Sequence, residues 1–224
     1  GARDENEDKT GFAHLFEHLM FGGSVNVEDF DKELQKAGGE SNAFTSNDLT
    51  NYYEIIPANN IETALWLESD RMLSLAFTEK SLEVQRNVVI EEFKQRYLNQ
   101  PYGDVWLELR PLAYEKHPYK WATIGKDIAH IENAVMQDVK DFFKKYYCPA
   151  NAILCISGNF DSEKIKGLIE KYYGSIPGGI KPARLLPFEP EQKNFRERII
   201  DRDVPADAFY YAFKMSERKN IRSE

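Results

Sequence analysis

Two of the four histidines in this 224-residue chain lie in one short apolar segment. The segment "GFAHLFEHLMF" spans residues 11–21 and contains His14, Glu17 and His18. Its apolar residues recur at helical spacing, and the glycine at Gly22 is typical of a helix end. Residues four positions apart project from the same side of a helix. His14 and His18 are therefore spaced to bind a single metal ion.

Glu17 adds a third chemical group to this pair. It follows His14 by three positions and precedes His18, so it lies at the edge of the face that the histidines share. There it reaches a water on the metal without being a ligand. The order His-x-x-Glu-His is the inverse of the His-Glu-x-x-His zinc motif. Zinc binds neutral imidazole and activates water at neutral pH, so we expect a catalytic zinc ion with Glu17 as general base.

A catalytic zinc site needs a third protein ligand. The helical pattern over residues 79–98 offers Glu91 and Glu92 side by side. Neighbouring residues point to different sides of a helix, so only one can face the site, and spacing alone leaves the choice open. A structural zinc site is the main alternative. Structural sites favour cysteine, however, and neither Cys148 nor Cys155 lies near the motif in the sequence.

Helical periodicity extends over much of the remaining chain. The segment "ESNAFTSNDLTNYYEIIP" predicts two short strands around a turn at residues 46–48, and "NAILCISGN" at 151–159 predicts a buried strand. The two cysteines near it are interpreted as buried small apolar residues. The acidic run "DENED" at 4–8 is interpreted as a solvated loop. Helices are expected over residues 11–21, 27–37, 58–76, 79–98, 103–114, 134–147 and 161–176.

The composition excludes some classes of partner. The formal net charge is −8, whereas nucleic acid and anionic lipid select clustered lysine and arginine. No apolar run approaches the roughly 20 residues that a membrane span requires. We therefore expect neither nucleic acid nor membrane as a partner. The chain opens without an initiating methionine or a signal-like segment, so we expect the natural start to lie upstream, and the compartment stays unknown.

The C-terminal part of the chain has a different character. Four of the ten prolines fall in "PGGIKPARLLPFEPEQ" at 177–192, which predicts an irregular linker. The segment at 195–215 reads as two strands with no helix after them. We therefore predict a catalytic unit over 1–190, followed at 191–224 either by the opening strands of a second, truncated unit or by strands that complete the first sheet.

Several motifs together resemble the pitrilysin (insulinase) family of zinc metallopeptidases. The likeness includes His14-Leu15-Phe16-Glu17-His18 and continues in the expected order over nearly the whole chain. It is closest to the N-terminal catalytic unit of a bacterial-type member, without that unit's first strands. The segments that carry it are "GARDE", "GFAHLFEHLMF", "AGGESNAFTSNDLTNYY", "NVVIEE", "HPYKWATIG" and "YYCPANAILCISGN".

The resemblance assigns roles to further residues. In the family's motif an arginine follows a supporting carboxylate that precedes the ligand glutamate by seven positions. Arg86 fits this register, which makes Glu92 the third ligand and Gln85 the supporting residue beside the ligands. Gln85 departs from the pattern because it brings no negative charge. The strand matching Asn42, Ala43 and Phe44 binds extended substrate in the family, so these residues are expected to do so here.

The resemblance also implies the fold, the activity and a partner. We expect an α+β fold, in which helices pack on a mixed, largely antiparallel sheet and one zinc ion is held between two helices. The expected activity is zinc-dependent endopeptidase hydrolysis of peptides or unfolded segments, held extended in a chamber formed with a second homologous half, in the same chain or another. The alternative is a catalytically idle metal-binding or assembly subunit, although such subunits usually lose ligands that this chain keeps.

Overall fold

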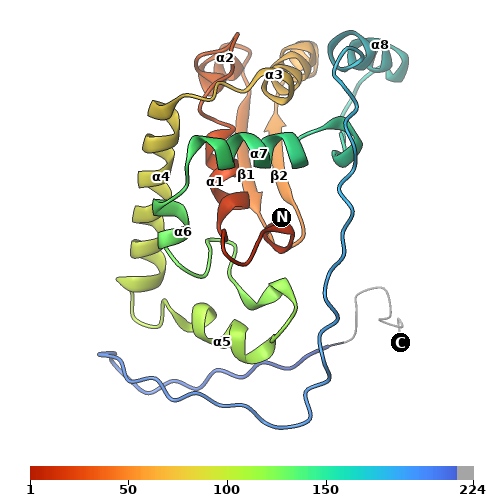
Figure 1. The fold of residues 1–224 in the computed structure, drawn as a ribbon. Coiled ribbons are helices and arrows are strands. Elements are labelled where there is room, and N and C mark those ends of the chain that lie inside the picture. The colour runs from red at the N-terminus through yellow and green to blue at the C-terminus, as the bar shows by residue number, and fades with distance from the viewer. Residues whose placement is uncertain (216–224) are drawn as a thin grey trace.

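The computed structural model describes residues 1–215 and has an α+β fold, which confirms the predicted class. Within these residues the sheet has two antiparallel strands, β1 (Glu40–Thr45) and β2 (Thr50–Ile55). Helix α1 lies against this hairpin, between it and α7 (Figure 1). The helices are α1 (Phe12–Leu19), α2 (Phe30–Lys36), α3 (Ile61–Ser74), α4 (Glu79–Phe93), α5 (Val105–Ala113), α6 (Ala129–Glu132), α7 (Met136–Tyr146) and α8 (Ser162–Tyr173).

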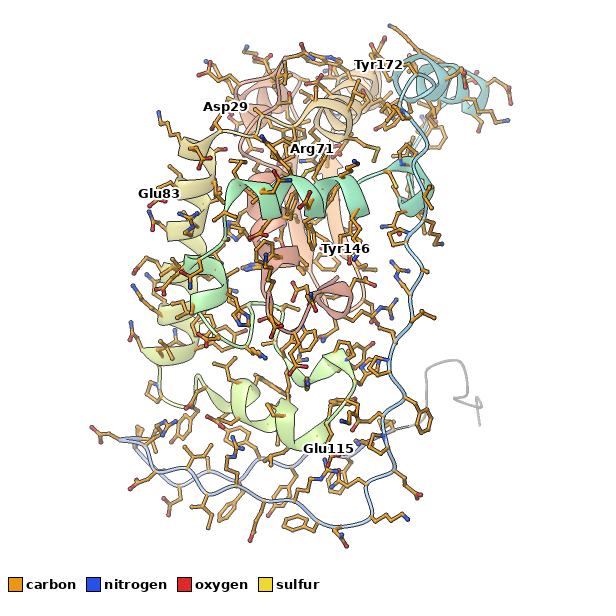
Figure 2. All side chains as sticks on the ribbon, in the orientation of Figure 1. Asp29, Arg71, Glu83, Glu115, Tyr146 and Tyr172 are labelled. Carbon is orange, nitrogen blue, oxygen red and sulfur yellow. The ribbon has the colours of Figure 1, made fainter. Side chains whose placement is uncertain are left out.

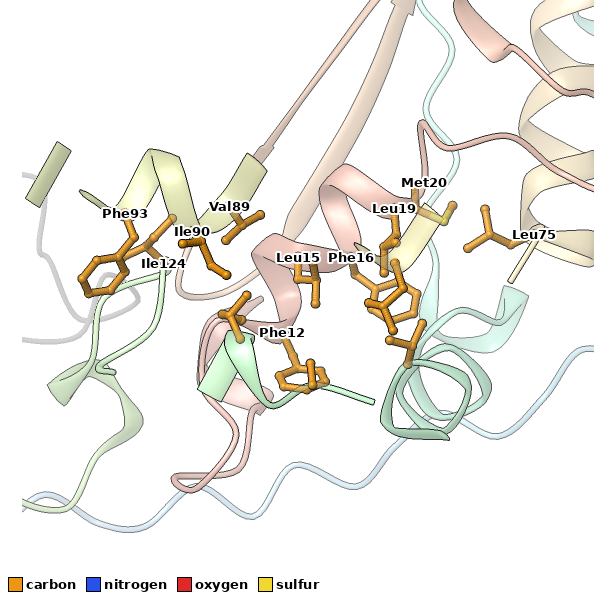
Figure 3. Close-up of a cluster of buried hydrophobic side chains, with 14 of the residues drawn as sticks. Phe12, Leu15, Phe16, Leu19, Met20, Leu75, Val89, Ile90, Phe93 and Ile124 are labelled. Atoms are coloured by element: carbon orange, nitrogen blue, oxygen red, sulfur yellow. The ribbon is translucent and has the colours of Figure 1, made fainter. Parts of the chain in front are cut away.

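Helix α1 is central to the main hydrophobic core. Phe12, Leu15, Phe16 and Leu19 on its inner side are almost completely buried. They form one cluster with apolar residues of α4 and α7, part of which Figure 3 shows. Burying side chains of this size is the dominant favourable term in folding. The core therefore fixes the distance and rotation between α1 and α4, the two helices that carry the predicted metal ligands.

The hairpin presents alternating faces, as strand geometry requires. Asn42 and Phe44 are exposed, whereas Ala43 and Thr45 on the other face are partly buried. The ladder pairs Ala43 with Tyr52 and Thr45 with Thr50. The Ser46 side chain and backbone bond to Leu49 and close the turn. The predicted hairpin and its turn are thus confirmed, and one edge of β1 carries no strand within residues 1–215.

Two helix boundaries bear on the site. Thr78 caps the start of helix α4 with a capping box, in which Thr78 and Ser81 satisfy each other's backbone N–H groups. After Phe93 the chain continues as the π-helical turn η3 (Lys94–Leu98). The helix predicted over 79–98 is therefore present, but its last turn is wider than an α-helical one. Turns of this kind often occur near functional sites.

The prediction of a buried strand at 151–159 is wrong. No residue of this segment forms part of a strand, and Ile153 in it is 95% exposed. A strand needs a neighbour that accepts its backbone hydrogen bonds. Within the described residues β1 and β2 bond only to each other, so the segment has no neighbour. The interpretation of both cysteines as buried is correct for Cys148 and wrong for the exposed Cys155.

The two strands predicted at 195–215 are also absent. This stretch is extended but unpaired, and it runs alongside α5 instead of joining the hairpin (Figure 1). Ion pairs join Arg198 to Glu108 and Arg202 to Asp104. Residues 216–224, the end of the predicted second unit, lie outside the described residues. The proposed division at residue 190 stays a prediction. None of the helices in the described part of the chain is long and apolar enough to span a bilayer.

Candidate metal centre

The structure brings His14, His18 and Glu92 together between α1 and α4. The two imidazole rings lie edge to face with centroids 4.8 Å apart. Glu92 Oε2 lies 3.6 Å from His14 Nε2 and 3.4 Å from His18 Nε2. One ligand atom of each residue lies within 4.8 Å of the others. Three groups from two helices therefore converge on one point.

This arrangement fits a zinc ion. Tetrahedral zinc with bonds of about 2.0–2.1 Å places its ligand atoms about 3.4 Å apart, close to the two separations found here. Two imidazoles and one carboxylate also match a known donor set of catalytic zinc, in which the fourth position is left open. Calcium and magnesium prefer oxygen ligands, so the pair of imidazoles argues against both.

The choice between Glu91 and Glu92 is decided by the rotation of α4. Glu92 faces α1, whereas Glu91 is exposed and pairs with Lys94 at 2.8 Å. The other oxygen of Glu92, Oε1, lies 2.7 Å from Arg96 Nη1, which comes from the π-helical turn. Arg96 is mostly exposed, so this ion pair contributes little to stability. It does leave Oε2 as the oxygen that faces the histidines.

Electrostatics favour the protonation states that bind a metal. Burial lowers the pKa of His14 to about 4, and the opposing attraction of Glu92 is smaller. His14 is thus neutral at pH 7, the state in which imidazole is a ligand. The pKa of Glu92 is lowered, chiefly by its interaction with His18, so its carboxyl is ionised. A neutral His14 and an ionised Glu92 are the forms that zinc requires.

Glu17 lies beside the hairpin. Its Oε2 accepts a hydrogen bond of 2.6 Å from the hydroxyl of Thr45, the last residue of β1. Glu17 is not in the group of ligand atoms that the structure brings together. The sequence argument placed Glu17 next to the metal but did not identify Thr45, because the contact joins residues 28 positions apart.

Gln85 shows no contact that supports its predicted role. Among residues 1–215, no hydrogen bond joins the Gln85 side chain to His14, His18 or Glu92. The Nδ1 atom of His14 is buried and has no protein partner there. Metal-binding histidines usually donate this second N–H to a carboxylate, a carbonyl or water. The support expected from Gln85 therefore stays a prediction.

The sequence argument missed Glu5, because the acidic run 4–8 is not a uniformly solvated loop. Glu5 is buried, and its carboxyl accepts hydrogen bonds from the backbone N–H groups of Gly11 and Ala13 at 3.0 and 2.7 Å. These are free donors at the start of α1, directly before His14. Burial raises the pKa of Glu5 to about 8, although the hydrogen bonds oppose this shift. A residue that precedes the motif by only a few positions thus anchors the start of the histidine helix.

The expected substrate strand lies next to this centre. Asn42 and Phe44 are exposed on β1, and the Ala43 N–H donates to Asn42 Oδ1 at 2.8 Å. The same strand ends at Thr45, which contacts Glu17. The hairpin therefore connects the predicted peptide-binding residues to the predicted general base. Their role in binding stays a prediction.

Comparison with known proteins identifies the family. A model described as Insulinase (Peptidase family M16) matches residues 1–125. The chain belongs to the M16 peptidase family. A second model, described as Peptidase M16 inactive domain, matches residues 133–223. The M16 match confirms the resemblance to the pitrilysin and insulinase peptidases. The first of the two matched regions, residues 1–125, contains His14, Glu17, His18 and Glu92.

Individual relatives agree with this assignment. The zinc protease PqqE of Helicobacter pylori is 35% identical over 207 residues, which cover 91% of this chain and 46% of the relative. The mitochondrial-processing peptidase subunit beta of Saccharomyces cerevisiae is 29% identical, with 83% of this chain and 40% of the relative covered. The crystal structure of a protease from Helicobacter pylori has a TM-score of 0.79 and 36% identity, over 85% of this chain and 47% of that one. This M16 chain spans less than half the length of these relatives.

Proposed function

We propose that this chain is the zinc-binding unit of an endopeptidase that hydrolyses extended peptides or unfolded polypeptide segments. The observation that supports this best is the convergence of His14, His18 and Glu92, with Glu17 on the helix of the histidines and outside the ligand set. A structural zinc site does not need an additional carboxylate that is not a ligand. The relatives named as zinc proteases support the same chemistry.

In this proposal His14, His18 and Glu92 hold one zinc ion. Zinc supplies Lewis acidity, which polarises the peptide carbonyl and makes water a better nucleophile. Glu17 is the general base: its carboxylate takes a proton from the attacking water and returns it to the nitrogen of the leaving amine. The proton taken from water is thus the one that the amine receives. Gln85 is proposed to support the ligands.

The substrate is proposed to bind along β1 in an extended conformation. The edge of β1 that faces away from β2 carries no strand within residues 1–215, so its backbone groups can bond to a peptide. Asn42, Ala43 and Phe44 are the residues that we assign to this contact. These residues lie on β1, whose last residue, Thr45, contacts Glu17. A peptide bound along β1 would therefore pass the metal.

A complete active chamber is proposed to need a second homologous half. The chain spans less than half of its relatives, and the open hairpin edge alone would not enclose a peptide. This half is part of the same polypeptide or of another. A catalytically idle subunit is the alternative. Both would bind metal, so only a measurement of peptidase activity distinguishes them.

The deciding experiment compares Glu17→Gln with the unmodified sequence in the complete natural protein. Glu17→Gln should keep its zinc, measured by elemental analysis, and lose peptidase activity by a hundredfold or more, roughly the range for a general base. Glu91→Gln is the matched control, because it removes an exposed carboxylate beside a ligand and should change neither quantity. Glu17→Gln protein with full activity would refute the mechanism. Absence of zinc from the unmodified protein would refute the site.

A further inference from the structure

The hydroxyl of Thr45 lies in a place where only one arrangement of its proton fits well. Thr45 Oγ1 lies 2.6 Å from Glu17 Oε2, 3.3 Å from Thr50 Oγ1 and 3.5 Å from the backbone oxygen of Ala13. Thr50 is its direct partner across the hairpin. All three neighbours lie in partly buried surroundings, so these contacts are shielded from bulk water.

A hydroxyl has one proton to donate, so the three contacts cannot be equal. An ionised carboxylate accepts hydrogen bonds and donates none, and a hydroxyl bonds to it at about 2.5–2.7 Å. The 2.6 Å separation therefore assigns the Thr45 proton to Glu17 Oε2. Thr45 can then accept from the Thr50 hydroxyl, which gives a chain that runs from Thr50 through Thr45 to Glu17.

We infer that Thr45 is a positioning residue that holds one carboxylate oxygen of Glu17 and leaves the other free for the proton of the attacking water. The inference rests on the proposed function. Because Thr45 is the last residue of the strand assigned to the substrate, it also couples the peptide-binding strand to the general base. Without the hydroxyl, the Glu17 side chain rotates away from this orientation, while His14 and His18 keep their places on α1.

Three substitutions separate this role from a purely structural one. Thr45→Val removes the hydroxyl but keeps the β-branched shape that suits a strand. Thr45→Ser keeps the hydroxyl and loses a methyl group. Thr50→Val removes the neighbouring hydroxyl but leaves the Thr45–Glu17 bond in place. All three are made in the complete natural protein, and zinc content is measured for each by elemental analysis.

The kinetic readout is the change in kcat relative to KM on one peptide. Hydrogen bonds to charged groups are strong enough that losing this one should lower kcat about tenfold in Thr45→Val, with KM and zinc content unchanged. Thr45→Ser should restore most of the loss, and Thr50→Val should lower kcat less than Thr45→Val. An unchanged kcat in Thr45→Val overturns the inference. An equal loss in Thr45→Ser also overturns it, because the methyl group would then be what matters.

A crystal structure of Thr45→Val supplies a readout that does not depend on activity. The Glu17 carboxylate should leave its position beside residue 45 in that variant and keep it in Thr45→Ser. A Glu17 side chain that stays in place in Thr45→Val overturns the inference even where the peptidase activity is confirmed. Conversely, full activity of Glu17→Gln refutes the proposed function even where Thr45→Val displaces Glu17. The two failures are therefore distinguishable.

Discussion

Two apolar segments of this chain differ in burial: helix α1 is largely buried, whereas residues 151–159 are largely exposed. On α1, five of eight residues are buried, and the helix lies between the hairpin, α4 and α7. The segment at 151–159 is also rich in apolar residues, yet Ile153 is 95% exposed and Leu154 48% exposed. The difference is the presence of a partner. An apolar pattern contributes to stability only where another surface removes it from water.

Charged residues show the same contrast. Arg71 of α3, labelled in Figure 2, has a side chain that is 2% exposed and pairs with Glu68. Its guanidinium carbon lies 4.2 Å from the ring centroid of Phe30 and 4.8 Å from that of Tyr52. Arg202 in the C-terminal stretch has a comparable ion pair, with Asp104 at 2.9 Å, but is about half exposed. Water competes with the second pair and scarcely reaches the first.

The largest expected effect tests the contrast in the core. Phe16→Ala should lower the free energy of unfolding by about 3–5 kcal/mol, because Phe16 is fully buried and a cavity remains. Phe188→Ala, at a position 90% exposed, should change it by less than about 0.5 kcal/mol. Urea unfolding of both variants measures this. Similar losses in both would show that the C-terminal stretch is packed in solution.

The next effect tests the contrast in charge. Arg71→Met should cost about 3 kcal/mol, because it leaves the Glu68 carboxylate without its buried cation. Arg202→Met removes an exposed pair and should cost less than about 1 kcal/mol. Thermal and urea unfolding at pH 7 compare the two. If Arg71→Met is as stable as the unmodified protein, the contacts of Arg71 with Glu68 and Tyr52 do not hold α3 to the hairpin.

The stabilisation of the folded state by zinc tests the proposed ligand set. Zinc at 100 times its dissociation constant should stabilise the folded state by about 2.7 kcal/mol, because it binds only that state. Glu92→Gln should largely remove this gain, and Glu91→Gln should keep it, although the two residues are adjacent. Thermal unfolding with zinc and with chelator measures the shift. A gain of equal size in both variants would place the third ligand elsewhere.

The smallest effect concerns the pH dependence of stability that Glu5, at the start of α1, contributes. The pKa of Glu5 is raised by burial to about 8, from 4.5 for the exposed group. Its contribution to stability is therefore complete below pH 4.5 and is lost as pH rises through 8. Between pH 5.5 and 7 the loss should be about 2 kcal/mol. Glu5→Gln should lack this part of the pH dependence, which urea unfolding across that range detects. Parallel pH profiles would contradict the raised pKa.

Much of the fold is readable because it is local. The helix at α1, the helix at α4 and the hairpin around residues 46–48 follow from periodicity and turn residues within a few positions. The prediction of a strand at 151–159 is wrong because an apolar pattern describes the segment itself and not the neighbouring strand with which it would have to pair. The interpretation of residues 4–8 as a solvated loop is wrong for Glu5 for a related reason. An acidic run in a sequence gives no sign of the helix start that Glu5 anchors.

The sequence by itself determined that His14 and His18 share a face, because four residues make about one helical turn whatever surrounds the helix. The tertiary structure decided that Glu92 and not Glu91 meets them, because the rotation of α4 is set by how its apolar side packs on α1. It also decided that Thr45 reaches Glu17, which depends on where the hairpin lies over α1. Contacts within one turn follow from backbone geometry, whereas contacts between elements follow from how the whole core packs.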